Sequence, residues 1–210
     1  MTDIKFCGLR TRNDVWTAID LRARWAGFVH SADHPDHMDP DDAAEAFRPA
    51  LNVVEAVSVT YDAGDDLLSH VRADFAPEWI QLHGSESPAR TAAVRRFAGK
   101  GVIKAIRVAG PEDLKAAEAY HGAADIILFD LQVPIRDDRA WPAAPKFSTP
   151  WILSGGLTAD NVREAVALTG ASAVSVSAGI EDMPGQKSAA RMKAFASALR
   201  SSAPRPSAPA

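Results

Sequence analysis

The sequence predicts an α/β protein, a single barrel in which eight parallel strands alternate with helices. Eight short apolar runs recur at even spacing along the 210 residues. Several of them are continuously apolar, as parallel strands covered on both faces are. Stretches with helical spacing lie between most of them, and eight strand–helix units with right-handed crossovers make a (β/α)8, or TIM, barrel. An open, doubly wound sheet is the alternative architecture.

Each expected element can be placed on the chain. The expected strands are residues 4–8, 26–30, 53–59, 79–83, 102–108, 125–130, 150–155 and 173–178. The expected helices include residues 13–24, 41–48, 87–98, 111–120, 159–168 and 187–199. The segments "DPDD", "SESP" and "TADN" supply Asp, Ser or Thr as N-cap residues before three of the helices. The sixth connection, "LQVPIRDDRAWPAAPKF", is interrupted by proline and leaves little room for a full helix.

Composition narrows the functional class. A net charge of −4 without a stripe of Lys and Arg argues against a nucleic-acid partner. No apolar run of about 18 residues is present, so no membrane span is expected. The single cysteine, Cys7, excludes an internal disulfide and, with no signal peptide visible, predicts a cytoplasmic protein. We expect one domain over residues 1–200 and a disordered Pro/Ala/Ser-rich tail over 201–210, as a monomer or a homodimer.

Polar and glycine residues follow the expected strands, at the barrel face where chemistry is normally found. In chain order these strand ends are Cys7-Gly8, His30, Thr60, His83-Gly84, Arg107, Asp130, Ser154-Gly155-Gly156 and Ser177-Ala178-Gly179. Glycines at a strand end let backbone N–H groups approach an anion, and the last two turns predict a phosphate site. The alternative is that the glycines only close tight turns.

Seven ordered motifs point to one family. They are "IKFCGLRTRNDV", "GFV" followed by "HPD", "IQLHGSES", "VIKAIRV", "IILFD", "ILSGGLTADNV" and "VSVSAGIEDMPGQKS". In this order they resemble the motifs of phosphoribosylanthranilate isomerase, a family of (β/α)8 enzymes in tryptophan biosynthesis. The resemblance covers about residues 3–200, nearly the whole chain.

The resemblance implies an aldose–ketose isomerase, an intramolecular oxidoreductase, that performs a cofactor-free Amadori rearrangement of a phosphorylated sugar without a metal. It assigns Cys7 as general base and Asp130 as general acid. It assigns substrate and phosphate binding to Lys5, His83, Gly155, Gly156, Ser177, Ala178 and Gly179. A free thiol has a pKa of about 8.5, so a cysteine base must ionise more readily than a free one. The alternative for Cys7 is a small buried apolar residue.

The chain departs from the family pattern on the side of the anthranilate carboxylate. Asp36 stands where the resemblance places an arginine that pairs with this carboxylate, and Ser175 stands where it places an aspartate. The glycine-rich loop after Asp130 is missing, and His37 or Arg136 are candidates to replace the arginine. Two further functions therefore stay open: a diverged enzyme isomerising another phosphosugar, or a phosphate-binding barrel with little catalysis.

The loop "SADHPDHMDP" also contains His34 and His37 among aspartates. Two histidines at this spacing with nearby carboxylates form a plausible ligand set for a metal. A solvated loop is the more common explanation for such a composition. We therefore expect no metal site.

Overall fold

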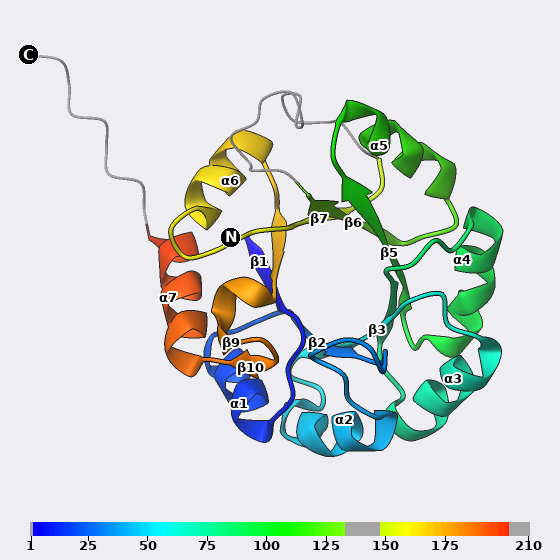
Figure 1. The fold of residues 1–210 in the computed structure, drawn as a ribbon, viewed down its shortest axis with the longest axis horizontal. Coiled ribbons are helices and arrows are strands. Elements are labelled where there is room, and N and C mark those ends of the chain that lie inside the picture. The colour runs from blue at the N-terminus through cyan, green and yellow to red at the C-terminus, as the bar shows by residue number, and fades with distance from the viewer. Residues whose placement is uncertain (1, 133–147, 202–210) are drawn as a thin grey trace, which may run out of the picture.

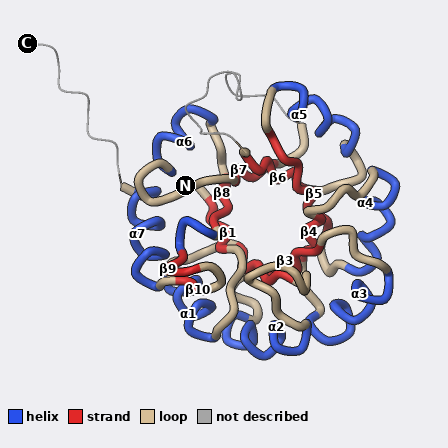
Figure 2. Tube along the Cα trace, viewed as in Figure 1, coloured by secondary structure: helices blue, strands red, loops and turns tan. Residues whose placement is uncertain are grey.

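The predicted barrel is confirmed by the computed structural model, which describes residues 2–132 and 148–201. Eight parallel strands are hydrogen-bonded in the order β1 to β8, and β8 pairs with β1 to close the ring (Figure 1). Helices surround this ring on its outside (Figure 2). Closure excludes the open doubly wound sheet.

The elements follow the expected alternation. The barrel strands are β1 (Asp3–Phe6), β2 (Trp25–Val29), β3 (Glu55–Thr60), β4 (Trp79–Leu82), β5 (Gly101–Val108), β6 (Ile126–Leu131), β7 (Trp151–Ser154) and β8 (Ala173–Val176). The α-helices are α1 (Arg12–Asp20), α2 (Pro40–Phe47), α3 (Asp65–His70), α4 (Pro88–Val94), α5 (Pro111–Ala116), α6 (Val162–Thr169) and α7 (Ala189–Arg200). Among these described helices, none is long and apolar enough to cross a bilayer.

Two elements were not predicted. Helix α3 continues into a π-helical turn, Val71–Phe75, which breaks the 3.6-residue period that would otherwise reveal a helix. A short antiparallel hairpin, β9 (Glu181–Met183) and β10 (Gln186–Lys187), follows β8, so the last helix begins at Ala189 rather than at residue 187. The predicted loop after Asp130 lies largely in residues 133–147, outside the described residues, as does the predicted tail beyond Ser201.

The predicted N-caps have different outcomes. Ser87 is confirmed as the N-cap of α4, because its Oγ accepts a hydrogen bond from Arg90 N at 3.2 Å. Before α6, Asn161 Oδ1 accepts instead from Thr158 N at 2.8 Å and closes a turn. Helix α6 therefore starts at Val162, three residues later than predicted. Asp39 precedes α2 but makes no side-chain hydrogen bond as its cap.

Strand side chains alternate between the barrel interior and the helices outside. On β1, Ile4 and Phe6 belong to the outer core, where Phe6 meets Phe195 of α7 edge-on. Lys5 and Cys7 have the opposite parity and therefore point inward. The inner apolar cluster consists of Trp25, Val29, Val57, Val59, Ile103, Ala105, Ile126, Leu128, Ile152 and Ala173.

Two glycines of the predicted phosphate turns are explained by packing. Gly155 has φ +95°, and a Cβ there would overlap the backbone of Leu131 on β6. Gly179 is equally confined, because a Cβ would overlap the carbonyl oxygen of Leu157. Gly156 is different: its φ is +60°, but nothing lies within 4 Å of the position of a Cβ. Open space for a ligand therefore exists over Gly156 and not over Gly155 or Gly179.

This contrast predicts unequal effects of alanine at adjacent positions. Gly156→Ala adds a left-handed alanine, at a cost of about 1–2 kcal/mol in the free energy of unfolding. Gly155→Ala adds the overlap with Leu131 and should cost at least about 1–3 kcal/mol more. Urea denaturation of the two variants measures the difference. Equal losses of stability would contradict the packing explanation.

Candidate active site

The carboxyl ends of the strands surround a cavity of about 290 Å³. Its lining comprises Cys7, Val29, His34, Asp36, Val59, Tyr61, Gln81, His83, Arg107, Leu128, Asp130, Gln132, Ser154, Ser175 and Ser177. All eight barrel strands, or the loops directly after them, contribute side chains to this set. The lining is mixed, with an apolar floor of Val29, Val59 and Leu128 and polar groups around it.

The structure brings together the predicted residues Cys7, His83, Asp130 and Ser177, which all line the cavity. The two residues at which the chain departs from the family pattern, Asp36 and Ser175, line it too. Lys5 is fully buried and is not part of the lining. The glycines and Ala178 of the predicted phosphate turns follow β7 and β8 at the same face but do not line this cavity.

Asp130, at the end of β6, is held by two neighbours. Its Oδ2 lies 3.3 Å from His83 Nε2 and accepts a hydrogen bond from Gln132 Nε2 at 3.0 Å. The other ring nitrogen of the histidine, His83 Nδ1, lies 3.3 Å from the amide nitrogen Gln81 Nε2. An amide nitrogen only donates, so His83 Nδ1 accepts and His83 Nε2 carries the hydrogen that faces Asp130. This chain of contacts fixes the orientation of the carboxyl group.

Three aromatic rings are stacked along one wall of the cavity. The Tyr61 ring lies between those of His34 and His83, with centroids 5.9 and 5.2 Å away and interplanar angles of 23° and 8°. Burial, reinforced by the charges of Cys7 and Asp130, raises the pKa of Tyr61 to about 12. Tyr61 is therefore a neutral phenol over the range in which most enzymes work. Sequence reasoning missed it, although its position just past Thr60 gives it inward parity.

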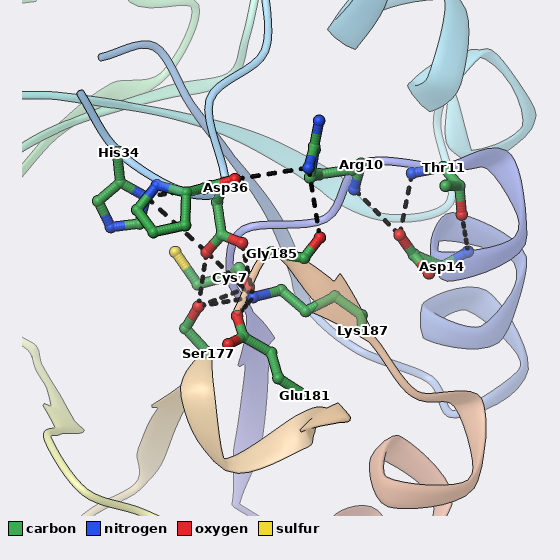
Figure 3. A network of polar contacts seen from close by, with 11 residues as sticks. Cys7, Arg10, Thr11, Asp14, His34, Asp36, Ser177, Glu181, Gly185 and Lys187 are labelled. Carbon is green, nitrogen blue, oxygen red and sulfur yellow. Dashed lines mark hydrogen bonds and ion pairs between the residues drawn. The ribbon is translucent and has the colours of Figure 1, made fainter. Parts of the chain in front are cut away.

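The sequence suggested that Asp36 presents an unpaired carboxylate to the cavity, but in the structure this carboxylate has a partner. Its side chain is 3% exposed, and its two oxygens accept hydrogen bonds from Lys187 Nζ at 3.1 and 3.0 Å. The side chain of Lys187 is itself fully buried and also pairs with Glu181, so β10, β9 and the loop after β2 converge on one ammonium group (Figure 3). A buried ammonium beside a buried carboxylate offsets most of the charge of that carboxylate.

Ser177 connects this network to the strand that carries Cys7. Its Oγ lies 2.9 Å from Lys187 Nζ, 3.1 Å from Asp36 Oδ2 and 3.1 Å from the carbonyl oxygen of Cys7 (Figure 3). A hydroxyl has one hydrogen, so it accepts from Lys187 and donates to one of the two oxygens at a time. The loops after β1, β2 and β8 are thereby joined beside the thiol.

Arg107, at the end of β5, is the one permanently charged cation among the described residues of the lining. The sequence placed Arg107 on the rim but assigned no role to it. His37, one candidate to replace the family arginine, does not line this cavity; it lines a separate surface groove beside α1 and α2. Arg136, the other candidate, lies outside the described residues.

The histidines and aspartates of residues 33–39 do not gather into a group with metal-ligand spacing. Within the described part of the chain, the group that does have such spacing is Asp41, His70 and Asp74. His70 Nε2 lies 3.3 Å from Asp41 Oδ1 and 2.9 Å from Asp74 Oδ2. All three residues are exposed, as acidic surface clusters commonly are.

Comparison with known families and sequences gives a consistent result. Residues 4–198 match the family model of N-(5'phosphoribosyl)anthranilate (PRA) isomerase. The N-(5'-phosphoribosyl)anthranilate isomerase of Rhodopseudomonas palustris strain TIE-1 is 38% identical over 209 residues, covering 95% of this chain and 98% of its own. The enzyme of the same name from Rhodospirillum centenum is 39% identical over 203 residues, covering 91% and 95%.

Solved structures agree. A phosphoribosyl anthranilate isomerase in complex with reduced 1-(o-carboxyphenylamino)-1-deoxyribulose 5-phosphate matches with a TM-score of 0.81 and 27% identity, covering 95% of this chain and 99% of its own. The isomerase from Thermotoga maritima matches with a TM-score of 0.82 and 25% identity over the same shares. The fold, the cavity at the strand ends and the sequence are thus all consistent with the family of these relatives.

The buried network around Lys187 should be strongly coupled. Lys187→Met leaves the carboxylates of Asp36 and Glu181 buried without their cation, which should lower the free energy of unfolding by about 3–5 kcal/mol. Adding Asp36→Asn to Lys187→Met should restore part of the loss, because one of the two charges is then removed. Urea denaturation of both single variants and the double variant measures this coupling.

Arg191→Ala is the matched control. It breaks an exposed ion pair between Arg191 of α7 and Asp182 of the β9–β10 hairpin, and it should change stability little. Strictly additive losses for Asp36→Asn and Lys187→Met would contradict the coupling.

Proposed function

The chain belongs to the N-(5'-phosphoribosyl)anthranilate isomerase family, and we propose that Cys7 is the general base and Asp130 the general acid of its isomerisation. The enzyme converts N-(5'-phosphoribosyl)anthranilate into the corresponding 1-deoxyribulose phosphate, a step of tryptophan biosynthesis. The observation that carries the residue assignment is that Cys7 and Asp130 line one cavity from β1 and β6. These strands lie three apart around the ring, so the two groups approach a bound sugar from different sides.

The rearrangement needs one proton delivered and one removed. The acid protonates the ring oxygen of the ribose, the bond from this oxygen to carbon 1 breaks, and the nitrogen lone pair forms an iminium. The base then takes the proton from carbon 2, and the electrons of this C–H bond neutralise the iminium to give an enolamine. The enolamine tautomerises to the ketone. Positioned acids and bases typically accelerate such steps by about 10²–10⁴-fold each.

The contacts of Asp130 support its role as acid. Among the described residues, His83 and Gln132 both contact the side chain of Asp130 at Oδ2. This arrangement reserves Oδ1 for the proton that is delivered to the ring oxygen. His83 acts as a positioning residue here, because its hydrogen-bonded tautomer fixes which oxygen faces the substrate.

We assign the phosphate of the substrate to the backbone N–H groups of the turns after β7 and β8. Open space over Gly156 supports this assignment, and Ala178 and Gly179 begin the short helical turn η5 (Ala178–Ile180) beside it. The hydroxyl of Ser177 is engaged with Lys187 and Asp36, so the backbone of this turn is the better donor. An alanine at position 178 is compatible with such backbone binding.

Arg107 is our candidate for the partner of the anthranilate carboxylate. Within the described lining it is the only guanidinium or ammonium group, and Asp36 is already paired with Lys187. A guanidinium binds a carboxylate through two parallel hydrogen bonds. With its single cysteine, the enzyme fits the reducing cytoplasm in which amino-acid biosynthesis takes place.

The catalytic assignment predicts large losses of turnover. Cys7→Ala and Asp130→Asn should each lower kcat by about 10²–10⁴-fold while KM changes little. The substrate is generated in situ, and the decrease of its fluorescence reports the rate. Asp20→Asn, at the exposed end of α1, is the control and should retain wild-type activity. A wild-type rate at background would refute the isomerase, and full activity of either variant would refute its assignment.

The carboxylate assignment predicts an effect on binding rather than on turnover. Arg107→Ala should raise KM by about 10-fold, since a hydrogen bond to a charged group contributes about 1.5–3 kcal/mol. Arg107→Lys should recover part of the loss by restoring the charge without the fork. Unchanged KM in Arg107→Ala would exclude Arg107 as the partner of the carboxylate.

A further inference from the structure

A second lysine lies inside the barrel, and the mechanism above gives it no function. Lys5 is on β1, two residues before Cys7, and its side chain is fully buried. Among the described residues, its Nζ atom has no hydrogen-bond partner. An ammonium group buried without a partner is strongly unfavourable, so a group that offsets this charge is expected nearby.

The thiol of Cys7 is such a group. A Cβ placed on Gly27 of β2 would lie 2.9 Å from Lys5 Nζ and 3.0 Å from Cys7 Sγ. Both atoms therefore converge on the space that this glycine leaves free. They are at most about 6 Å apart, the range within which an opposite charge favours the ionised form of a group.

The two strands that flank β1 place no carboxylate in register with Lys5. On β8, the residue in register with Lys5 is Ser175, whose side chain is neutral. On β2, the residue in register with Lys5 is Trp25, which belongs to the inner apolar cluster. Neither side chain carries a charge, and in the buried interior the attraction between unlike charges is only weakly screened.

Several other titratable and charged groups face Cys7. The titratable and charged side chains that share its cavity are His34, Asp36, Tyr61, His83, Arg107 and Asp130. Asp36 is paired with Lys187, and Tyr61 is a neutral phenol. Asp130 is in hydrogen-bonding contact with His83 and Gln132 and shares the cavity with the cation of Arg107. Lys5 remains as the unpaired charge closest in sequence to the thiol.

We propose that Lys5 holds Cys7 as a thiolate, so that the base is already ionised when the substrate binds. This role rests on the proposed function, because it supplies the ionised thiol that proton abstraction from carbon 2 requires. The thiol proton leaves to solvent, the ammonium keeps its proton, and the thiolate accepts the proton of carbon 2 during turnover. Lys5 touches no substrate and is a positioning residue for the charge of the base.

The test is the pH dependence of Cys7 alkylation, which needs no isomerase activity. The chain contains one cysteine, so iodoacetamide modification reports this thiol alone. The wild-type rate should be half-maximal at or below about pH 7.5, as for activated cysteines. In Lys5→Met the midpoint should rise to about 8.5 or above, and the ionised fraction of the thiol at pH 7 should fall at least about 8-fold. The plateau rate at high pH should be no lower in Lys5→Met than in the wild type, because access to the thiol is unchanged and a thiolate of higher pKa is the stronger nucleophile.

Lys104→Met is the matched control, since Lys104 is also buried but pairs with Glu86 at 2.8 Å on the outer side of the barrel. It should lower the urea midpoint of unfolding and leave the alkylation midpoint unchanged. Lys5→Met should unfold at a urea concentration no lower than the wild type, because desolvation of the buried ammonium offsets its attraction to the thiolate.

An alkylation midpoint that is identical in wild type and Lys5→Met would overturn the proposal. If Lys5→Met does not fold, the wild type decides alone: a midpoint above about 7.5 refutes an activated thiol. Failure of the proposed isomerase function is distinguishable, because an inactive enzyme with a low, Lys5-dependent midpoint would keep this inference and lose the other.

Discussion

Closure of the eight-stranded ring is the constraint on which the site depends. Because β8 pairs with β1, every strand has two neighbours, and side chains of one parity must enter the interior. The interior is narrow and is filled mostly by Val, Ile, Leu and Trp side chains. A lysine on this face cannot reach water, so the register that places Cys7 at the mouth also places Lys5 beneath it. The geometry of the base is a consequence of barrel closure.

The barrel holds its buried ammonium groups in two different ways. Lys104 and Lys187 each face at least one carboxylate within hydrogen-bonding distance. Lys104 on β5 pairs with Glu86 in the loop after β4, and Lys187 on β10 pairs with Asp36 in the loop after β2. The Lys187 network ties the β9–β10 hairpin to the loops after β1 and β2, beside the cavity. Such pairs contribute chiefly by fixing positions, because desolvation offsets most of their attraction. In the part of the chain that the structure describes, Lys5 has no carboxylate partner, which is why we assign its charge to the neighbouring thiol.

The fold and half of the site could be predicted from the sequence. Short apolar runs at even spacing predicted the strands, and the rule that chemistry lies at strand ends located Cys7, His83, Asp130 and Ser177. The rest depends on contacts that no local pattern contains. Asp36 and Lys187 are 151 positions apart in the chain, so no local sequence pattern indicates their ion pair. The two glycines after β7 also look alike in the sequence. A Cβ on Gly155 would overlap the backbone of Leu131, whereas a Cβ on Gly156 would meet nothing within 4 Å.

The two departures from the family pattern act together on the charge around Cys7. A carboxylate at position 175 would stand in register with Lys5 and would neutralise it inside the barrel. Serine at this position leaves the ammonium unpaired below the thiol. The carboxylate of Asp36 lines the same cavity as Cys7, and Lys187 donates hydrogen bonds to both of its oxygens. Position 175 thus carries no negative charge that would neutralise Lys5. The negative charge at position 36, which would oppose the thiolate, has Lys187 as a partner. On the proposal above, Ser175 therefore leaves the ammonium of Lys5 free to stabilise the thiolate, and Lys187 limits the opposing effect of Asp36.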